Sequence, residues 1–254
     1  MLEFLSIPMF NQERKIRVYL PMDYQSTEKR YPVLYMHDGQ NVFTDDEAIG
    51  GISLGLEKYL NEKKAELIVV AIDQNTTGQE RINEYCPWVN GEYCKELLGY
   101  ESTLGGKGEK YVSYIVNDLK PLIERKYRTQ TDQTYMAGIS LGGLISTYAA
   151  CHYPHLFKRV AILSSAFYRN QEDIENLLKK ADLSLIEKFY MDCGTKEAGG
   201  NENLSKQFYE SNQAIYEILK DKVENTKFEM DHGAEHGYGF FKKRFPEILS
   251  FICS

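Results

Sequence analysis

The feature that most constrains the fold of this chain is a series of eight short apolar runs, separated by polar and amphipathic stretches. The runs occupy residues 2–7, 15–20, 32–37, 66–72, 133–138, 159–164, 188–193 and 227–230. Several of them, such as ELIVVAI at 66–72, consist almost entirely of apolar or β-branched residues. This composition is typical of strands that are covered on both faces of a mostly parallel sheet.

The stretches between the runs predict helices. Residues 109–127 carry apolar side chains at intervals that share one helical face: Val112, Ile115, Leu119, Leu122 and Ile123. Pro121 is expected to kink this helix or to end its first half. Residues 144–153, 204–222 and 240–252 also read as helices. The alternation predicts a single α/β domain over residues 1–254, with about eight mostly parallel strands flanked by helices.

One interval, from about residue 73 to residue 107, interrupts this alternation. It follows the strand that ends near Ile72, has little periodicity and is rich in Tyr, Asn and Gly. We interpret it as a lid-like insertion over the carboxyl edge of the sheet, where binding groups of such folds gather.

Composition excludes several classes of partner. The net charge of −7 and the pI of about 5.4 argue against a nucleic-acid or anionic membrane surface. We find no signal peptide and no run of the length that a membrane span needs. The five cysteines are scattered and contain no C-x-x-C. We therefore expect a cytoplasmic protein with free thiols, no metal or other cofactor, and a small-molecule substrate.

The segment Gly138-Ile139-Ser140-Leu141-Gly142 matches G-x-S-x-G between a predicted strand and a predicted helix. Such a turn exposes the serine oxygen in a strained conformation, and glycines are needed because other chains approach closely. Ser140 is therefore our candidate nucleophile. The backbone N–H of Leu141 would begin the following helix and help to bind an oxyanion.

A serine nucleophile needs a histidine base and an acid that orients it, in the order Ser, Asp/Glu, His along the chain. His232 and His236 both follow the last predicted strand, and we prefer His236 because it lies directly before the terminal helix. Glu197 and Asp192 are the candidate acids, and we prefer Glu197 because it lies in the loop beyond its strand.

The loop HDGQN at 37–41 follows another predicted strand and is the expected source of a second oxyanion donor. The donor is the N–H of Gly39 or of Gln40, while His37 is expected to brace the loop.

Gln40 is also a candidate substrate-binding residue, together with Arg81, Tyr85 and Trp88 of the insertion. Aromatic faces there would stack on flat rings or on sugars, and Arg81 would bind an oxygen-rich group. The alternative is that these rings form only the core of the insertion.

Several motifs together resemble the putative esterase family of the α/β-hydrolase superfamily, which includes feruloyl and acetyl-xylan esterases, esterase D and siderophore trilactone esterases. The segments that carry the resemblance are YMHDGQNVF, GKGEKY, LKPLIERKYRT, MAGISLGGLISTYAACHYPHLF, DCGTKE and EHGYGFFKKRFPEILSF. The resemblance implies an α/β-hydrolase fold with Ser140 as nucleophile and His236 as base. Glu197 falls where relatives carry the acid, although the commoner residue is Asp.

The residues and the resemblance together predict a serine carboxylic-ester hydrolase with a Ser140–His236–Glu197 triad. We expect a polar ester with an aromatic acyl group or a sugar alcohol, such as a feruloylated or acetylated saccharide. A siderophore trilactone is the runner-up substrate. An acyltransferase with the same triad and a catalytically silent ligand-binding module are the alternative functions.

Overall fold

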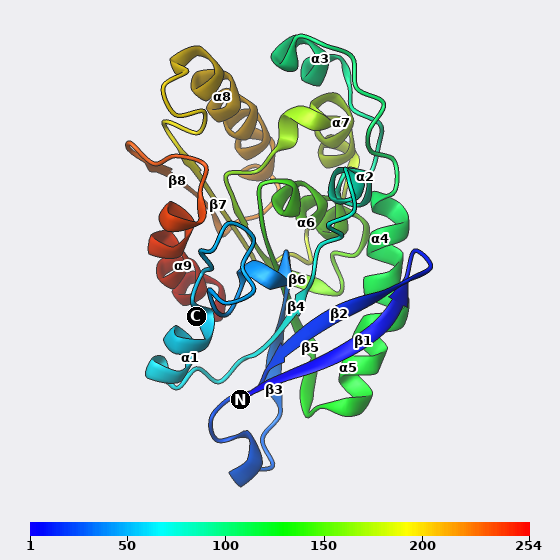
Figure 1. Cartoon of the computed structure of the whole chain (residues 1–254), viewed down its shortest axis with the longest axis vertical. Helices are drawn as coiled ribbons and strands as arrows, with labels where there is room; N and C mark the ends of the chain where they lie inside the picture. The colour runs from blue at the N-terminus through cyan, green and yellow to red at the C-terminus, as the bar shows by residue number, and fades with distance from the viewer.

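The structure is a computed structural model that describes residues 1–254, and its centre is one eight-stranded sheet (Figure 1). The strands are β1 (Leu2–Met9), β2 (Gln12–Tyr19), β3 (Tyr31–His37), β4 (Ile68–Ile72), β5 (Thr129–Ile139), β6 (Phe157–Leu163), β7 (Lys188–Gly194) and β8 (Thr226–Asp231). Each of the eight predicted runs forms one of these strands.

The sheet has the order β1-β2-β4-β3-β5-β6-β7-β8. β1 and β2 form an antiparallel hairpin, β2 is also antiparallel to β4, and all other neighbours are parallel. The hairpin turns at Phe10 and Asn11, both at positive φ, as a two-residue connection requires. The predicted mostly parallel sheet is confirmed, and the carboxyl ends of β3 to β8 therefore meet at one edge.

Helices cover both faces of the sheet (Figure 1). They are α1 (Leu56–Lys63), α2 (Glu80–Tyr85), α3 (Glu92–Leu98), α4 (Gly108–Tyr114), α5 (Lys120–Lys126), α6 (Leu141–His152), α7 (Gln171–Lys180), α8 (Glu202–Leu219) and α9 (Tyr238–Cys253). A π-helical segment, η3 (Ile115–Leu119), joins α4 to α5, and short 3₁₀ turns are η1 (Tyr24–Ser26), η2 (Gly39–Asn41) and η4 (Phe167–Arg169). None of the helices is both long and apolar enough to cross a membrane.

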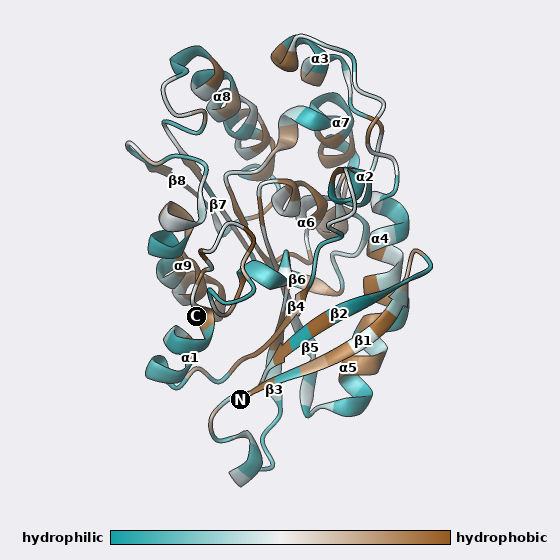
Figure 2. Cartoon of the chain, viewed as in Figure 1, coloured by the Kyte–Doolittle hydropathy of each residue, from teal (hydrophilic) through white to brown (hydrophobic).

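Alternate side chains of the parallel strands point into two cores. Leu34 and Met36 of β3 pack with α1 and α9, whereas Val33 and Tyr35 of the same strand pack with helices of the other layer. The hydropathy colouring shows the apolar strands enclosed between the two helical layers (Figure 2). Burial on both faces explains why the strands read as continuous apolar runs.

The stretch predicted as one helix over residues 109–127 is α4, η3 and α5 in succession. Pro121 lies in the first turn of α5. Proline removes one backbone N–H, and the π-helical turn before it accommodates that loss without ending the helix. Pro121 therefore changes the helical winding at this point.

The insertion at residues 73–107 contains α2 and α3 and is held to the sheet by buried ion pairs. Arg14 of β2 binds Glu84 at 2.8 Å, and Arg17 of the same strand binds Asp73 at 2.6 Å. These contacts anchor the start of the insertion and α2 beside the carboxyl edge of the sheet.

Candidate active site

Ser140 occupies a strained turn between β5 and α6. Its φ of 59° and ψ of −120° lie outside the regions that a residue with a Cβ ordinarily adopts. The conformation is held because the Ser140 N–H donates to the Leu163 carbonyl of β6 at 2.9 Å, and the Ser140 carbonyl accepts from Ala166. This is the backbone of a nucleophile elbow.

The glycines around Ser140 are required by close packing. A Cβ on Gly138 would lie 2.1 Å from the Gly142 carbonyl oxygen. A Cβ on Gly143 would lie 2.0 Å from the Ser165 Oγ. Gly138 and Gly143 therefore have no room for a side chain, and a Cβ on Gly142 would lie 3.3 Å from the Cβ of His37, which together account for the G-x-S-x-G-G pattern.

His236 lies in the loop between β8 and α9, and its Nδ1 is 2.6 Å from Oε2 of Glu197. Phe208 and Phe241 pack edge-on against the imidazole, at 5.5 and 5.3 Å between ring centroids. Because Nδ1 is bound to Glu197, Nε2 is the nitrogen left for proton transfer. His236 and Ser140 line the same two cavities, although no hydrogen bond joins them.

Glu197 follows β7 and is almost completely buried. Its second oxygen, Oε1, accepts from the Ser164 hydroxyl at 2.5 Å and from the Gly194 N–H at 2.6 Å. Burial alone would raise the pKa of Glu197, but the bonds from His236, Ser164 and Gly194 outweigh it and hold the pKa below its usual value. The carboxylate is therefore ionised and fixed in position.

Asp192, the other candidate acid, binds Arg244 at 2.7 Å and does not reach His236. Complete burial raises the pKa of Asp192 to about 7, against the attraction of Arg244. Arg244 also donates to the Ser164 hydroxyl at 3.1 Å, and this hydroxyl donates to Glu197. Ser164 therefore connects Arg244 to Glu197. Sequence reasoning missed both Ser164 and Arg244. The φ of 43° at Ser164 marks a constrained turn that the sequence alone does not reveal.

The other two histidines considered have different surroundings. His232 is exposed in the loop after β8. His37 is buried and bound to the Tyr111 hydroxyl at 2.9 Å and to Ser146 Oγ at 3.1 Å. Burial lowers the pKa of His37 to about 4, so its ring is neutral and holds the loop after β3 against α4 and α6.

The predicted oxyanion residues lie on two adjoining segments. Leu141 begins α6, where helical N–H groups lack partners within the helix. Gly39 lies in η2 against the end of β4, and a Cβ there would be 2.5 Å from Asp73 Oδ1. The Gln40 side chain donates to the carbonyl of Gln74 and accepts from its N–H. Gln40 thereby positions Gln74, which lines a cavity that opens at Ser140.

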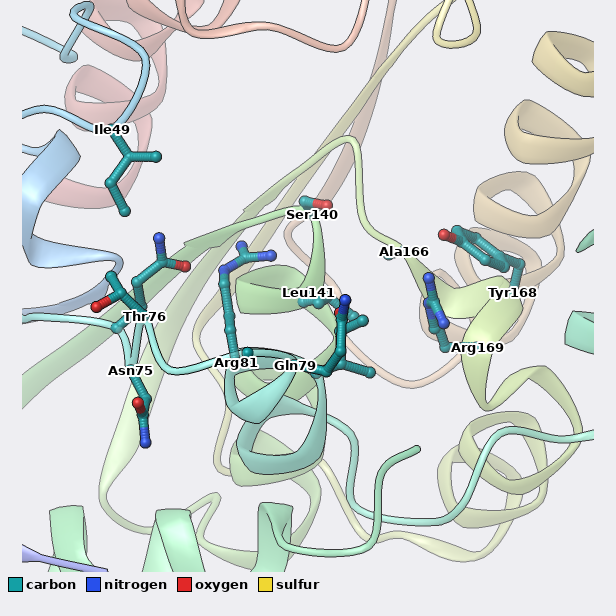
Figure 3. A pocket seen from close by; sticks show the side chains of 13 residues that line it. Ile49, Asn75, Thr76, Gln79, Arg81, Ser140, Leu141, Ala166, Tyr168 and Arg169 are labelled. Carbon is teal, nitrogen blue, oxygen red and sulfur yellow. The ribbon is translucent and has the colours of Figure 1, made fainter. Parts of the chain in front are cut away.

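Three cavities open at Ser140. The largest, of about 450 Å³, is mainly polar and lies between the insertion and η4 (Figure 3). A second, of about 310 Å³, extends past His236 toward Tyr238. The third, of about 220 Å³, is mainly apolar and is lined by Leu97 and Leu98 of α3 and by Leu204 and Phe208 of α8. The candidate nucleophile therefore borders three cavities, of which the largest is lined mostly by polar residues and the smallest mostly by apolar ones.

Of the four predicted substrate-binding residues, the structure brings Arg81 and Tyr85 together, with the Arg81 guanidinium 5.2 Å from the centre of the Tyr85 ring. Arg81 lines the two larger cavities and is held by Asp38 through bonds of 2.7 and 2.8 Å. Tyr85 is completely buried, and its hydroxyl accepts from the Asp38 N–H. Trp88 packs edge-on against Tyr148 at 5.4 Å. Neither ring lines a cavity at Ser140: Tyr85, at the end of α2, is buried, and Trp88, in the loop after α2, packs against Tyr148. This differs from the substrate contact expected of them.

The sheet, the elbow and the histidine after the last strand define an α/β-hydrolase. The chain belongs to the putative esterase family, whose model matches residues 7–252. It is accordingly a carboxylic ester hydrolase.

The chain is similar in sequence to other proteins and in fold to several solved structures. The uncharacterized protein YbbA of Bacillus subtilis (strain 168) is 25% identical over 248 residues, covering 94% of this chain and 92% of YbbA. The siderophore hydrolase EstA of Aspergillus nidulans superposes with a TM-score of 0.78 at 16% identity, covering 98% of this chain and 94% of EstA. A ferulic acid esterase superposes with a TM-score of 0.71 at 19% identity, covering 99% of this chain and 97% of that protein.

Proposed function

We propose that the chain hydrolyses esters through a Ser140–His236–Glu197 triad and an acyl-enzyme. Ser140 attacks the ester carbonyl while His236 accepts its proton and passes it to the leaving alcohol. Glu197 holds the imidazole in place and stabilises its protonated form. Water then attacks the acyl-enzyme, again with His236 as base. The observation that carries this proposal is the 2.6 Å contact between His236 and a buried, ionised Glu197 beside the strained Ser140.

Backbone N–H groups would stabilise the oxyanion of each tetrahedral intermediate. Leu141 supplies one donor from the start of α6, and Gly39 or Gln40 supplies the second from η2. The support is positional, since both segments follow strands that end at the same edge of the sheet.

We propose as substrate a polar ester with an aromatic acyl group or a sugar alcohol. The apolar cavity beside Ser140 suits a ring, and the polar cavity suits hydroxyl groups, because Gln74, Asn75 and Gln79 line it. The similarity to a ferulic acid esterase agrees with this class.

A siderophore trilactone is a second candidate because three separate cavities meet at Ser140. That arrangement gives room for an ester with several aromatic arms. The similarity to a siderophore hydrolase is in line with this alternative.

A substrate panel separates these candidates. We expect kcat/KM for methyl ferulate and an acetylated sugar to exceed that for p-nitrophenyl palmitate by at least about 10-fold, since no cavity at Ser140 resembles a long apolar channel. Hydrolysis of an aromatic trilactone at a higher kcat/KM than methyl ferulate would favour the second candidate. A preference for palmitate would contradict both.

Glu197→Gln should lower kcat by roughly 10³-fold, because the amide cannot stabilise the protonated imidazole as the carboxylate does. Asp192→Asn is the matched control: its carboxylate binds Arg244 rather than His236, so kcat should change much less. Steady-state kinetics and thermal unfolding of both variants check this. A larger kcat loss in Asp192→Asn, with its fold intact, would reassign the acid.

Trp88→Ala should lower stability more than it alters specificity, because the indole packs against Tyr148 and the core. Loss of a half-buried aromatic side chain should cost about 2 kcal/mol of the free energy of unfolding. Denaturant unfolding measures this cost, and the ratio of kcat/KM for methyl ferulate and acetylated sugar should stay within about twofold. A large change in that ratio would indicate that Trp88 contacts the substrate.

A further inference from the structure

The polar cavity at Ser140 carries positive charge without any carboxylate on its wall. Its lining residues include Arg81 and Arg169 but no Asp or Glu. The chain as a whole has a net charge of −7, so this is a local reversal of the prevailing sign. Figure 3 shows the two arginine side chains on either side of Leu141.

The two arginines differ in how their charge is balanced. Arg81 forms a bidentate pair with the buried carboxylate of Asp38, at 2.7 and 2.8 Å. Arg169 has no carboxylate within ion-pair distance, and its Nε is buried without a hydrogen-bond partner. The Tyr168 side chain stabilises the charged guanidinium, but no carboxylate balances its charge, so an anionic ligand would be favourable beside it.

Arg169 is also held on a fixed part of the backbone. It ends η4, its carbonyl accepts from the Gly91 N–H, and the next residue, Asn170, donates to the carbonyls of Trp88 and Val89. The guanidinium lies 5.3 Å from the ring of Tyr168, which lines the same cavity. The Arg169 guanidinium therefore lies beside the cavity and next to the Tyr168 ring, on a backbone segment that is fixed by hydrogen bonds.

We propose that Arg169 binds a carboxylate of the substrate in this cavity, so that the preferred esters carry a negative charge away from the scissile bond. This inference rests on the proposed function, since it takes Ser140 as the point of attack. The planar guanidinium suits a carboxylate because it offers paired N–H donors in one plane. Arg169 is thus a specificity residue and takes no part in bond making.

Two matched pairs of esters test the proposal. In the first, 4-acetoxybenzoate is compared with methyl 4-acetoxybenzoate, so that the charge is on the leaving group. In the second, mono-(4-nitrophenyl) terephthalate is compared with its methyl ester, so that the charge is on the acyl group. The wild type, Arg169→Gln and Arg169→Lys are assayed on both pairs. Arg125→Gln, which removes an exposed charge from α5, is the control.

In at least one pair, Arg169→Gln should reduce kcat/KM for the carboxylate by about 10- to 100-fold while the methyl ester changes less than about twofold. Arg169→Lys should restore part of the preference, and Arg125→Gln should leave it unchanged. Equal losses on charged and neutral esters would assign Arg169 a structural role and overturn the proposal. An unchanged ratio in both pairs would overturn it as well.

Failure of the proposed function gives a different result. If the wild type hydrolyses none of the four esters, the catalytic proposal fails. The carboxylate site is then tested by calorimetric binding of terephthalate to Ser140→Ala. Binding that is lost in the Ser140→Ala/Arg169→Gln double variant supports the site, and binding that persists there refutes it.

Discussion

Ser140→Ala is expected to lower kcat on every ester by about 10⁶-fold, because the proposed acyl-enzyme forms on the Ser140 hydroxyl. The variant keeps the Cβ and the backbone strain of the elbow, and the Ser140 hydroxyl makes no capping hydrogen bond to α6. Its melting temperature should therefore stay within about 2 °C of the wild type. Single-turnover and steady-state assays with a p-nitrophenyl ester measure the loss.

Covalent labelling provides an independent check on the same residue. A fluorophosphonate should label the wild type at Ser140 and leave Ser140→Ala unlabelled, as peptide mass spectrometry can show. Ser184→Ala, at an exposed serine far along the chain, is the control and should retain both labelling and turnover. Labelling of any other serine, or turnover retained in Ser140→Ala, is incompatible with the proposed nucleophile.

The strands could be predicted because their physical signal is local. Most residues of β3, β4, β6 and β7 are buried, so these strands appear in the sequence as apolar runs of similar length. β5 begins with a partly exposed polar segment, so only its second half is apparent as an apolar run. The elbow could be predicted because its glycines form a recognisable motif: Gly138 is imposed by a contact within the turn, of 2.1 Å to Gly142, and Gly143 by a contact of 2.0 Å to Ser165 of the neighbouring loop. His236 could be chosen from the sequence because it lies between the last predicted strand and the last predicted helix.

The features that escaped prediction depend on tertiary contacts. Arg244 is on α9 and Ser164 follows β6, yet Arg244 binds Ser164, and Ser164 binds Glu197, only because β6, β7 and α9 pack together. The helices α2 and α3 in the insertion were not predicted, because helices of six and seven residues have less than two turns and so show little periodicity. Tyr85 and Trp88 were predicted to form a stacking surface, but sequence alone does not reveal which side of a short helix such as α2, or of the loop that follows it, faces the core.

His236→Ala is expected to lower kcat by about 10⁴-fold or more, because Ser140 is a poor nucleophile without a base and the leaving alcohol then lacks an acid. KM should change far less, since the polar cavity is bounded mainly by the insertion and η4. His232→Ala is the matched control: the same residue type, in the same loop, exposed and distant from Glu197 in the hydrogen-bond network.

Both variants remove an imidazole from the same loop, so any difference between them reports on the position of the histidine alone. If the contact of 2.6 Å to Glu197 defines the base, only His236→Ala should suppress both acylation and deacylation. Burst kinetics with p-nitrophenyl acetate separate these steps, and circular dichroism verifies the fold of each variant. Equal losses from the two variants would mean that the loop, rather than the imidazole of His236, is what catalysis requires. A greater loss from His232→Ala would transfer the role of base to that residue and leave the Glu197–His236 pair without a catalytic function.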